Sequence, residues 1–444
     1  MIHLKKYSFI FIILTIFSIL IIIYLTSLDK SNKLNAIVVS ENEDNLTLLT
    51  SNDLIYNISK NKLNAKFEDN ILITYNKSPD ELTNILDLDI VNYEINPKNK
   101  KKNTFETGIF NKYYEKAYNK LLELTLDEKI GQLFLIRYDE DNALNDLSKY
   151  KVSGFVFYEK DFQNKTKDEV LNMINSLNEG NNIPLLISTD EEGGKVVRVS
   201  SNPNLSSERF KSSHELYQTG GMLAIKEDTI KKSNLLKSLG INLNLAPVVD
   251  VSTNPLNYIH ERTIQENTEI TSEYAKTVIT ASHNTGVTYA MKHFPGYGNN
   301  QDTHKTSSID KRSYEMIMNN DIPPFKTGIE NNAEAILISH NIVTSIDSLN
   351  EASLSNAIHN LLRNTLSFTG IIITDDISMK AISKPVEASL KAVLAGNNLI
   401  ITSNPDISIQ TIKNAVSSKI ISEELINALS LRVLAFKYYK GLIN

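Results

Sequence analysis

Cysteine is absent from the sequence. Its absence excludes disulfide bonds, zinc sites built from thiolates and a cysteine nucleophile. An excess of positive charge is absent as well, because the formal net charge is −6 and the isoelectric point is near 5.8. We therefore expect no nucleic-acid partner. The composition is that of a globular protein, with 41% hydrophobic and 22% charged residues over 444 positions, enough for one large domain and a smaller unit.

The N-terminus carries a long apolar run. Lys5 and Lys6 precede an uncharged stretch over residues 7–27 that is rich in Ile, Leu and Phe. A helix of about 20 such residues spans the hydrocarbon core of a bilayer, and no A-x-A cleavage signal follows this one. We predict a transmembrane signal anchor over residues 1–30 and a single-pass cell-membrane protein whose remainder is extracellular. The alternative is a signal peptide that is cleaved to release a secreted protein.

Residues 31–96 have a different sequence pattern from the rest of the chain. Short β-type runs recur there, separated by clusters of Asn, Asp, Ser and Lys. They predict a small, mostly β module, whose role as a stalk, a spacer or a wall-binding unit the pattern leaves open. A basic linker over residues 97–112 follows, and we assign residues 113–444 to the main domain.

Strands and helices alternate in the main domain. Thr125 to Glu128 is a capping box that opens a helix, and helical stretches such as 222–238 and 383–395 separate a series of apolar runs. Because the runs are continuously apolar, they are typical of buried parallel strands. Eight of them predict a (β/α)8 TIM barrel, with a doubly wound open sheet as the alternative. The runs are QLFLIRY (132–138), GFVFY (154–158), PLLISTD (184–190), INLNLAPVVD (241–250), VTYAMKH (287–293), AEAILISH (333–340), GIIITD (370–375) and NNLIITS (397–403).

Ionisable residues end five of these runs in succession. In a (β/α)8 barrel the C-terminal ends of the strands form the active-site face, so we expect a site there. Two of the residues, Asp250 and Asp376, fit equally well as caps of the helices that follow. The strand-end residues are Asp190, Asp250, Lys292, His293, His340, Asp375 and Asp376.

The stretch MKHFPGYGNNQDTHKTSS, residues 291–308, indicates the chemistry of this site. Asp302 lies two residues before His304, and on an extended segment it can orient the imidazole ring. A histidine held in this way donates and accepts protons near neutral pH. Together with the rigid carboxylate of Asp375, it suits a two-step displacement on a glycoside.

The same loop holds Gly296 and Gly298, which let the backbone turn. The clustered histidines at 293, 304 and 340 lack the H-x-H and HExxH spacings of metal sites. We therefore expect neither a metal ion nor a cofactor.

Four motifs carry a resemblance to a known family. They are TLDEKIGQLF at 125–134, STDEEGGKVVRV at 188–199, KHFPGYGNNQDTH at 292–304 and ITDDISMKAI at 373–382. In this order they resemble the glycoside hydrolase family 3 β-N-acetylglucosaminidases of bacteria, which act on sugars derived from peptidoglycan. The resemblance covers roughly residues 120–444 and implies a single (β/α)8 barrel.

The resemblance also implies a role for nine residues. Asp375 matches the nucleophile, His304 the acid/base and Asp302 the partner of that histidine. The implied reaction removes terminal β-linked N-acetylglucosamine with retention, through a covalent glycosyl-Asp375 intermediate. The matches to sugar-binding positions are Asp190, Arg198, Arg262, Lys292, His293 and Met379.

These roles imply a retaining exo-β-N-acetylglucosaminidase. Its partners would be peptidoglycan fragments that contain N-acetylglucosamine and, through the N-terminal helix, the membrane; we expect a monomer. Three alternatives stay open: a phosphorylase of the same family in which phosphate replaces water, a non-catalytic cell-wall-binding protein, and a metal-dependent hydrolase on the same barrel.

Overall fold

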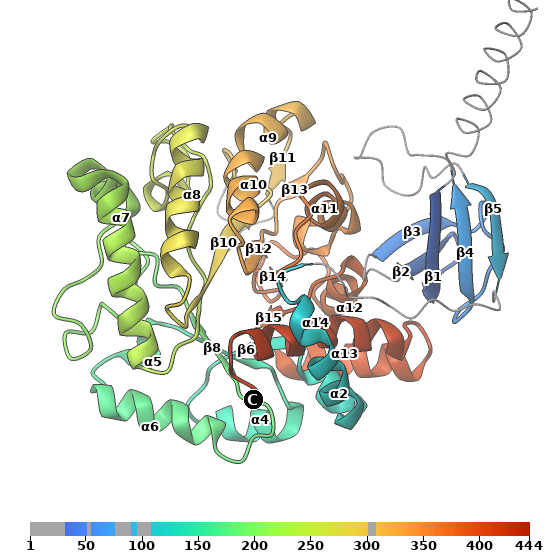
Figure 1. The fold of residues 1–444 in the computed structure, drawn as a ribbon, viewed down its shortest axis with the longest axis horizontal. Coiled ribbons are helices and arrows are strands. Elements are labelled where there is room, and N and C mark those ends of the chain that lie inside the picture. Colours follow the sequence, from blue (N-terminus) through green and yellow to red (C-terminus); the bar gives the residue numbers. More distant parts are fainter. Residues whose placement is uncertain (1–31, 51–54, 76–89, 96–107, 301–307) are drawn as a thin grey trace, which may run out of the picture.

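A computed structural model describes residues 32–50, 55–75, 90–95, 108–300 and 308–444. Figure 1 shows a large α/β unit built around one sheet, with a small antiparallel sheet beside it. A two-stranded parallel pair, β11 (Ile309–Asp310) and β13 (Ile342–Val343), completes the strands of the described ranges.

The central sheet has eight parallel strands in the order β14-β12-β10-β9-β8-β7-β6-β15. Strands that follow one another in the chain are neighbours in the sheet, without the reversal that a doubly wound sheet requires. Each of the eight predicted apolar runs coincides with one of these strands, and β10 alone extends beyond its run, by one residue. They are β6 (Phe134–Arg137), β7 (Gly154–Phe157), β8 (Leu186–Thr189), β9 (Leu243–Asn244), β10 (Thr288–Phe294), β12 (Ala335–Ile338), β14 (Ile371–Thr374) and β15 (Ile400–Thr402).

The ring of strands is nearly closed. β15 pairs with β6 in a regular parallel ladder, whereas β14 and β15 are joined by a single bridge between Ile373 and Leu399. At this seam the Thr374 hydroxyl accepts the Ile401 N–H at 3.0 Å, so a side chain takes the place of a backbone acceptor. The predicted (β/α)8 barrel is therefore corrected to an α/β barrel with one incomplete seam.

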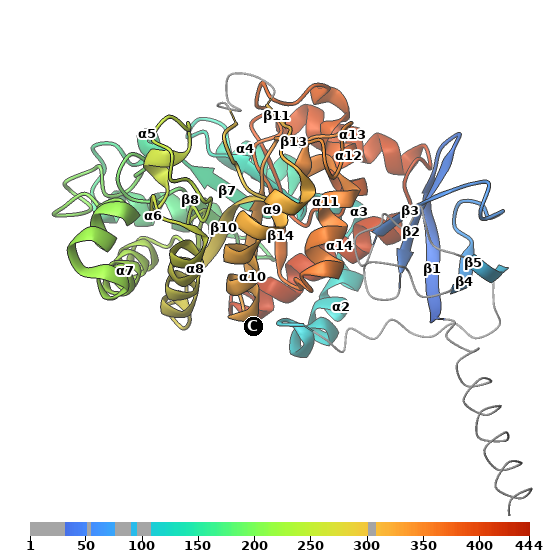
Figure 2. The same cartoon turned by 90° about the horizontal axis from the view of Figure 1, so that it is seen from above.

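Helices surround the barrel, as Figure 2 shows from above. The predicted capping box is confirmed, because the Thr125 hydroxyl accepts from the Glu128 N–H and the Glu128 carboxylate accepts from the Thr125 N–H. The helices are α2 (Tyr114–Glu123), α3 (Leu126–Gly131), α4 (Ala143–Tyr150), α5 (Glu159–Phe162), α6 (Lys167–Asn178), α7 (Ser213–Ser238), α8 (Thr268–Ser282), α9 (Tyr314–Asn320), α10 (Ile322–Glu330), α11 (Asn356–Asn360), α12 (Pro385–Ala395), α13 (Pro405–Ser417) and α14 (Glu423–Tyr439). Short helical turns are η2 (Asn111–Tyr113), η3 (His260–Arg262), η4 (Ala352–Leu354) and η5 (Leu361–Thr365).

Helix α14 crosses the end of the barrel at which the strands begin. The buried ammonium of Lys437 donates to Gln132 Oε1 at 2.8 Å and to the Ser153 carbonyl at 3.0 Å, just before β6 and β7. Lys440 pairs with Glu334, just before β12, at 2.9 Å. Protein therefore covers this end, and the C-terminal ends of the strands face the opposite way.

One face of each strand fills the barrel. On β6, Leu135 belongs to the inner apolar cluster, while Phe134 and Ile136 pack outward against the helices. On β7, Val156 points inward and Phe157 outward. Side chains alternate along a strand, so every second residue after an inner residue also points inward. Near the C-terminal end of the strand, these residues point into the mouth of the barrel.

The small sheet is antiparallel and has the order β3-β2-β1-β4-β5. It packs against the barrel unit beside α11, α12 and α13 (Figures 1 and 2). Val39, Leu49 and Ile55 join the outer apolar cluster of the barrel, and Asn356 donates to the Ile55 carbonyl at 3.1 Å. The strands are β1 (Asn32–Glu41), β2 (Asn45–Thr50), β3 (Ile55–Ser59), β4 (Asn70–Tyr75) and β5 (Ile90–Ile95).

The predicted fold class needs a second correction, at its N-terminal helix. Residues 1–30, on which the transmembrane prediction falls, lie outside the described residues. Within the described ranges, no helix is both long and apolar enough to cross a membrane. The longest of them, α7, has 26 residues but carries charged side chains such as Asp228 and Lys232. The transmembrane helix and the single-pass cell-membrane location are accordingly not retained.

Candidate active site

Charged side chains form the layer at the mouth of the barrel. Asp190 follows β8, Lys292 lies in β10 and Asp375 follows β14. Each stands two positions after a residue of the inward row, so the alternation along the strands carries all three into the mouth. The structure thus brings together at one end of the barrel residues that are up to 185 positions apart in the sequence (375 − 190).

Lys292 is the centre of a buried ion cluster. Its ammonium lies 2.6 Å from Asp190 Oδ1 and 2.6 Å from Glu192 Oε1. Arg262 donates to both carboxylate oxygens of Glu192, from Nε at 3.0 Å and from Nη2 at 2.7 Å. The side chains of Lys292 and Glu192 are only 4% and 5% exposed, so solvent screens these pairs little.

The electrostatics keep the cluster charged. Burial opposes the ionisation of Glu192, but Arg262 and Lys292 outweigh it and hold the pKa of Glu192 well below its ordinary value. Burial also opposes the charge on Lys292, yet Asp190 and Glu192 raise the pKa of this ammonium above its ordinary value. The cluster therefore offers fixed donors and acceptors of the kind that bind sugar hydroxyls.

Glu192 was not predicted from the sequence. This residue lies in the motif at 188–199, and its position between Asp190 and the glycine pair at 193–194 was the available signal. Its neighbour Glu191 has a different task, since its buried carboxylate accepts the N–H groups of Arg198 and Val199, both at 2.7 Å. Glu191 therefore shapes the turn, and Glu192 holds the cations.

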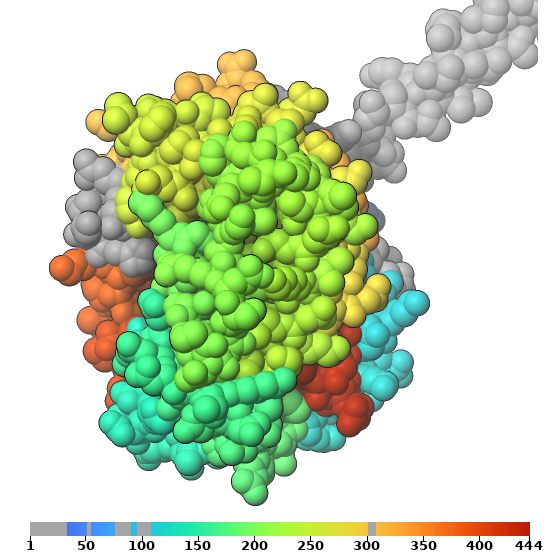
Figure 3. All heavy atoms as spheres, turned by 90° about the vertical axis from the view of Figure 1, so that its left-hand side faces the viewer, coloured from blue at the N-terminus to red at the C-terminus, as the bar shows by residue number. Residues whose placement is uncertain are grey.

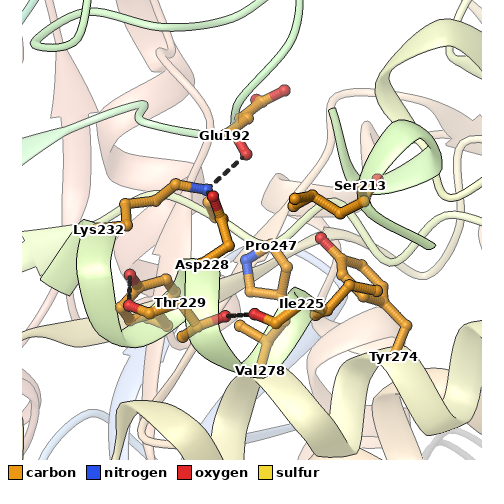
Figure 4. Close-up of a pocket in the computed structure, with 12 residues that line it drawn as sticks. Glu192, Ser213, Ile225, Asp228, Thr229, Lys232, Pro247, Tyr274 and Val278 are labelled. Atoms are coloured by element: carbon orange, nitrogen blue, oxygen red, sulfur yellow. Dashed lines mark hydrogen bonds and ion pairs between the residues drawn. The ribbon is translucent and has the colours of Figure 1, made fainter. Parts of the chain in front are cut away.

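A second buried lysine supports Glu192 from behind, as Figure 4 shows. Lys232, on α7, donates to the backbone carbonyl of Glu192 at 3.0 Å and pairs with Asp228 at 3.0 Å. These groups line a cavity of about 20 Å³ together with Tyr274 and Pro247. Such a volume has room for a water molecule but not for a sugar ring. The cavity is therefore part of the support of the ion cluster.

His293 is oriented by Asp250. Asp250 Oδ2 accepts the backbone N–H of His293 at 3.1 Å and lies 2.8 Å from its Nδ1, while Oδ1 accepts the Tyr297 N–H at 2.6 Å. Because a carboxylate only accepts, the geometry assigns a proton to Nδ1 and lets Nε2 accept from Arg262 Nη2 at 3.3 Å. Asp250 is therefore not a helix cap, and Asn267 caps the helix that follows.

Asp375 is held at the end of β14. Its N–H donates to the Ile338 carbonyl of β12 at 3.0 Å, and its Oδ1 accepts the Asp376 N–H at 2.9 Å. His340 Nε2 lies 2.9 Å from the carbonyl oxygen of Asp376. The carboxylate of Asp376 accepts the Ser378 N–H at 2.8 Å and so stabilises the turn after the strand. Of the two neighbouring aspartates, Asp375 is the one in the inward row.

Tyr158 and Arg137 were not predicted but share the mouth with the predicted Arg198. The guanidinium carbons of Arg137 and Arg198 lie 4.0 and 5.6 Å from the centroid of the Tyr158 ring. Burial raises the pKa of the Tyr158 hydroxyl, and the nearby carboxylates of the mouth, Asp190 foremost, raise it further. The signal in the sequence was positional, since Tyr158 ends its apolar run, Arg137 is the next-to-last residue of its run, and both are in the inward register.

The loop after β10 makes two close approaches. Gly296 and Gly298 have φ angles of 129° and 59°, a region that favours glycine. A Cβ at 296 would overlap the carboxylate of Asp321, and one at 298 would overlap the guanidinium of Arg312. The start of the loop is therefore fixed by packing against the Arg312–Asp321 ion pair, whose Nη1–Oδ2 distance is 2.7 Å.

The roles of all nine predicted site residues stay predictions, and three of these residues have not yet been placed. Asp302 and His304 lie outside the described residues. Met379 is half-buried in the turn after β14, where its N–H donates to the Asp376 carbonyl at 3.0 Å.

The fold and the mouth together define a class of protein. A parallel α/β barrel that carries an inward carboxylate and a buried set of fixed charges at the C-terminal ends of its strands has the layout of a glycoside-cleaving enzyme.

Comparisons with known proteins give the family. The family model described as Glycosyl hydrolase family 3 N terminal domain matches residues 125–436. A β-hexosaminidase of Actinobacillus pleuropneumoniae is 31% identical over 268 residues, 57% of this chain and 74% of that protein. A β-hexosaminidase of Glaesserella parasuis is 32% identical over 273 residues, 59% and 77% of the two chains. The chain belongs to glycoside hydrolase family 3 and is a glycosidase.

A solved structure agrees with this assignment. A glycoside hydrolase family 3 β-N-acetylglucosaminidase from a Paenibacillus species matches with a TM-score of 0.68 and 27% sequence identity. The match covers 72% of this chain and 64% of that chain, so this chain spans just under two thirds of the Paenibacillus structure. The predicted resemblance to the β-N-acetylglucosaminidases of the family is confirmed.

Proposed function

We propose that this glycosidase is a retaining exo-β-N-acetylglucosaminidase in which Asp375 is the nucleophile and His304, oriented by Asp302, is the acid and base. The observation that carries the proposal is the position of Asp375, which stands in the same inward layer as Lys292 and Asp190. The names of the relatives, β-hexosaminidases and a β-N-acetylglucosaminidase, support the choice of sugar.

The ion cluster would bind the sugar that is cleaved. Asp190 keeps acceptor capacity for hydroxyl protons, and Lys292 and the Nε2 side of His293 face the same cluster. Because Glu192 fixes both Arg262 and Lys292, the donors are set before the substrate arrives, and little side-chain entropy is lost on binding.

The reaction would take place in two displacements. Asp375 attacks the anomeric carbon, the bond to the leaving oxygen breaks, and that oxygen takes the electron pair together with a proton from His304. In the second step His304 takes a proton from water as the water oxygen attacks the same carbon. The bond to Asp375 then breaks, which frees the carboxylate and the β-anomer of N-acetylglucosamine.

The substrates would be glycan fragments derived from peptidoglycan. Support for this class is the resemblance of the four sequence motifs to enzymes that act on such fragments.

The test is stereochemical and uses the full chain. 4-Nitrophenyl β-N-acetylglucosaminide is incubated with the protein, and the anomeric protons of the product are followed by NMR, with 4-nitrophenyl β-glucoside as the matched control. The proposal expects N-acetylglucosamine that appears first as the β-anomer, and much slower cleavage of the glucoside. Initial release of the α-anomer would refute retention, and cleavage of the glucoside alone would refute the choice of sugar.

A further inference from the structure

Arg137 stands in the mouth of the barrel without a role in the reaction described above. It ends β6 two positions after Leu135, an inner-core residue, so it points into the same layer as Asp190 and Asp375. Its guanidinium carbon lies 4.0 Å from the centroid of the Tyr158 ring. Stacking on an aromatic face leaves the N–H donors at the edge of the guanidinium group free to bind a ligand.

Arg137 and Arg198 differ from the other arginines in one respect. Among the described residues, neither guanidinium donates a hydrogen bond or forms an ion pair, and Nε of Arg198 is buried without a partner. The five other arginines each donate to a carboxylate or to a carbonyl oxygen; they are Arg209, Arg262, Arg312, Arg363 and Arg432.

The charges around the pair are already assigned. Asp190 and Glu192 are neutralised by Lys292 and Arg262 in the ion cluster. Asp161 lies within electrostatic reach of Arg137 but uses its carboxylate to accept the Tyr158 N–H at 2.7 Å. Arg137 therefore presents up to five N–H donors and one positive charge to the mouth, close to Arg198 on the same tyrosine ring.

We propose that Arg137, stacked on Tyr158, forms a subsite for an anionic group, a carboxylate or a phosphate, next to the sugar-binding position predicted for Arg198. A guanidinium group matches these anions in a bidentate, charge-assisted manner. The anion is either a substituent on the leaving group of the glycoside or free phosphate. The position of the subsite beside Asp375 ties it to the reaction, so this inference rests on the proposed function.

The experiment compares the activity of the full chain on two glycosides of N-acetylglucosamine. They are aryl β-N-acetylglucosaminides whose leaving groups carry a carboxylate or, at the same ring position, the neutral carboxamide. Wild type should cleave the carboxylate with the higher kcat/KM, and Arg137→Met should lose about 10- to 100-fold on the carboxylate and little on the carboxamide, as expected for hydrogen bonds to a charged group. Arg137→Lys, which keeps the charge but not the bidentate fork, should fall between the two.

A matched control separates the subsite from general electrostatics. Lys160 is an exposed cation two residues after Tyr158, and Lys160→Met should leave both kcat/KM values unchanged. Thermal unfolding of each variant shows whether it is folded. Equal losses on the two glycosides in Arg137→Met, with a folded protein, would overturn the proposal for the leaving group.

Inorganic phosphate distinguishes the second source of the anion. If phosphate occupies the subsite as the acceptor, its oxygen attacks the glycosyl-Asp375 carbon, the bond to Asp375 breaks, and N-acetylglucosamine 1-phosphate forms in an Arg137-dependent manner. If neither glycoside is cleaved, the proposed function has failed, and calorimetric binding of phosphate to wild type and to Arg137→Met still tests the subsite. The subsite would be overturned if cleavage did not depend on the charge of the leaving group and if wild type and Arg137→Met bound phosphate equally or not at all.

Discussion

The ammonium of Lys232 and the backbone carbonyl of Glu192 lie 3.0 Å apart, although one belongs to an outer helix and the other to the loop after β8. The carboxylate of the same Glu192 holds Arg262 and Lys292. A charge outside the barrel is thereby coupled to the donors inside its mouth. The cavity beside this contact, shown in Figure 4, has a volume of only about 20 Å³, so the loop after β8 has little space into which it can move.

Lys232→Met should lower both stability and substrate affinity. The substitution leaves Asp228, whose side chain is only 12% exposed, without its partner, which costs up to about 3–5 kcal/mol of unfolding free energy. It also releases the carbonyl of Glu192, so we expect KM for the aryl N-acetylglucosaminide to rise more than kcat falls. Urea unfolding and steady-state kinetics measure the two effects.

The double variant Asp228→Asn/Lys232→Met is the control for this prediction. It removes the unpaired charge and should recover a large part of the lost stability. The raised KM should remain, because the Glu192 carbonyl still lacks its donor. Recovery of both quantities would mean that Lys232 acts on stability alone.

Glu192→Gln should weaken catalysis without a gross change of shape. The amide is similar in size, but it removes the charge that pairs with both Arg262 and Lys292. We expect kcat/KM to fall about 10²-fold, in the range for loss of one member of a buried charge pair. Glu261→Gln is the control, because Glu261 pairs with Lys195 at the surface and is 60% exposed. Equal losses in the two variants would contradict this role of Glu192.

The low pKa of Glu192 also predicts a difference in acid stability. The folded-state pKa lies below the unfolded value near 4.5, so the stabilising contribution is complete above that value and is lost as the pH falls toward the folded pKa. Between about pH 5 and pH 3, wild type should lose unfolding free energy more steeply than Glu192→Gln. Denaturant unfolding at several pH values measures the unfolding free energy of both proteins. If it depends on pH equally in wild type and in Glu192→Gln, the prediction is wrong.

Lys437 should make the protein more stable at alkaline pH. Burial lowers the pKa of this ammonium to about 7, below its ordinary value of 10.5. Between these values the unfolded chain binds more protons than the folded one, so stability rises with pH by at most about 1.4 kcal/mol per unit. Lys437→Met should flatten the rise and be the more stable protein at pH 7. Unfolding free energies at pH 7 to about 9 test this, and an unchanged slope would contradict it.

Gly296→Ala should disturb the loop after β10. Its φ of 129° and its closeness to Asp321 leave no space for a methyl group. We expect a loss of activity, because displacement of Tyr297 breaks the contact of its N–H with Asp250, which orients His293. The matched control is Gly180→Ala, where φ is also positive but nothing lies within 4 Å. That variant should cost about 1 kcal/mol and keep full activity.

The strands and their C-terminal ends were predictable because buried parallel strands have continuously apolar sequences. Runs such as GIIITD are apolar on both faces, and a charged residue after them breaks the pattern visibly. The seam between β14 and β15 was not predictable, because it depends on the Thr374 hydroxyl taking a backbone role that no spacing reveals.

The missed residues share a physical reason. Arg137 and Tyr158 lie at or next to the ends of their runs, but the sequence did not show which alternate positions point inward. The barrel shows this, with Leu135 inside and Phe134 outside. Lys232 lies on a helix, where a buried lysine and a solvated one look alike in sequence. The function of Glu192 depends on Arg262, which is 70 positions away along the chain.

The small N-terminal sheet shows the same limit. The division into a small β module, a linker and a main domain stays a prediction, and the sequence pattern did not indicate that Val39 and Ile55 are buried in the outer apolar cluster of the barrel. The Ser422 N–H also donates to the Val39 carbonyl at 2.8 Å. Apolar strand residues do not reveal whether they face their own sheet or a neighbouring unit.

The proposed role of Asp375 as the nucleophile is tested by a search for the covalent bond between Asp375 and the sugar. Full-chain protein is mixed with dinitrophenyl β-N-acetylglucosaminide, quenched during turnover, digested and analysed by mass spectrometry. We expect one N-acetylglucosaminyl group on the peptide that contains Asp375, and no label and no turnover in Asp375→Asn. Turnover that persists in Asp375→Asn, or a label on another peptide, would contradict it.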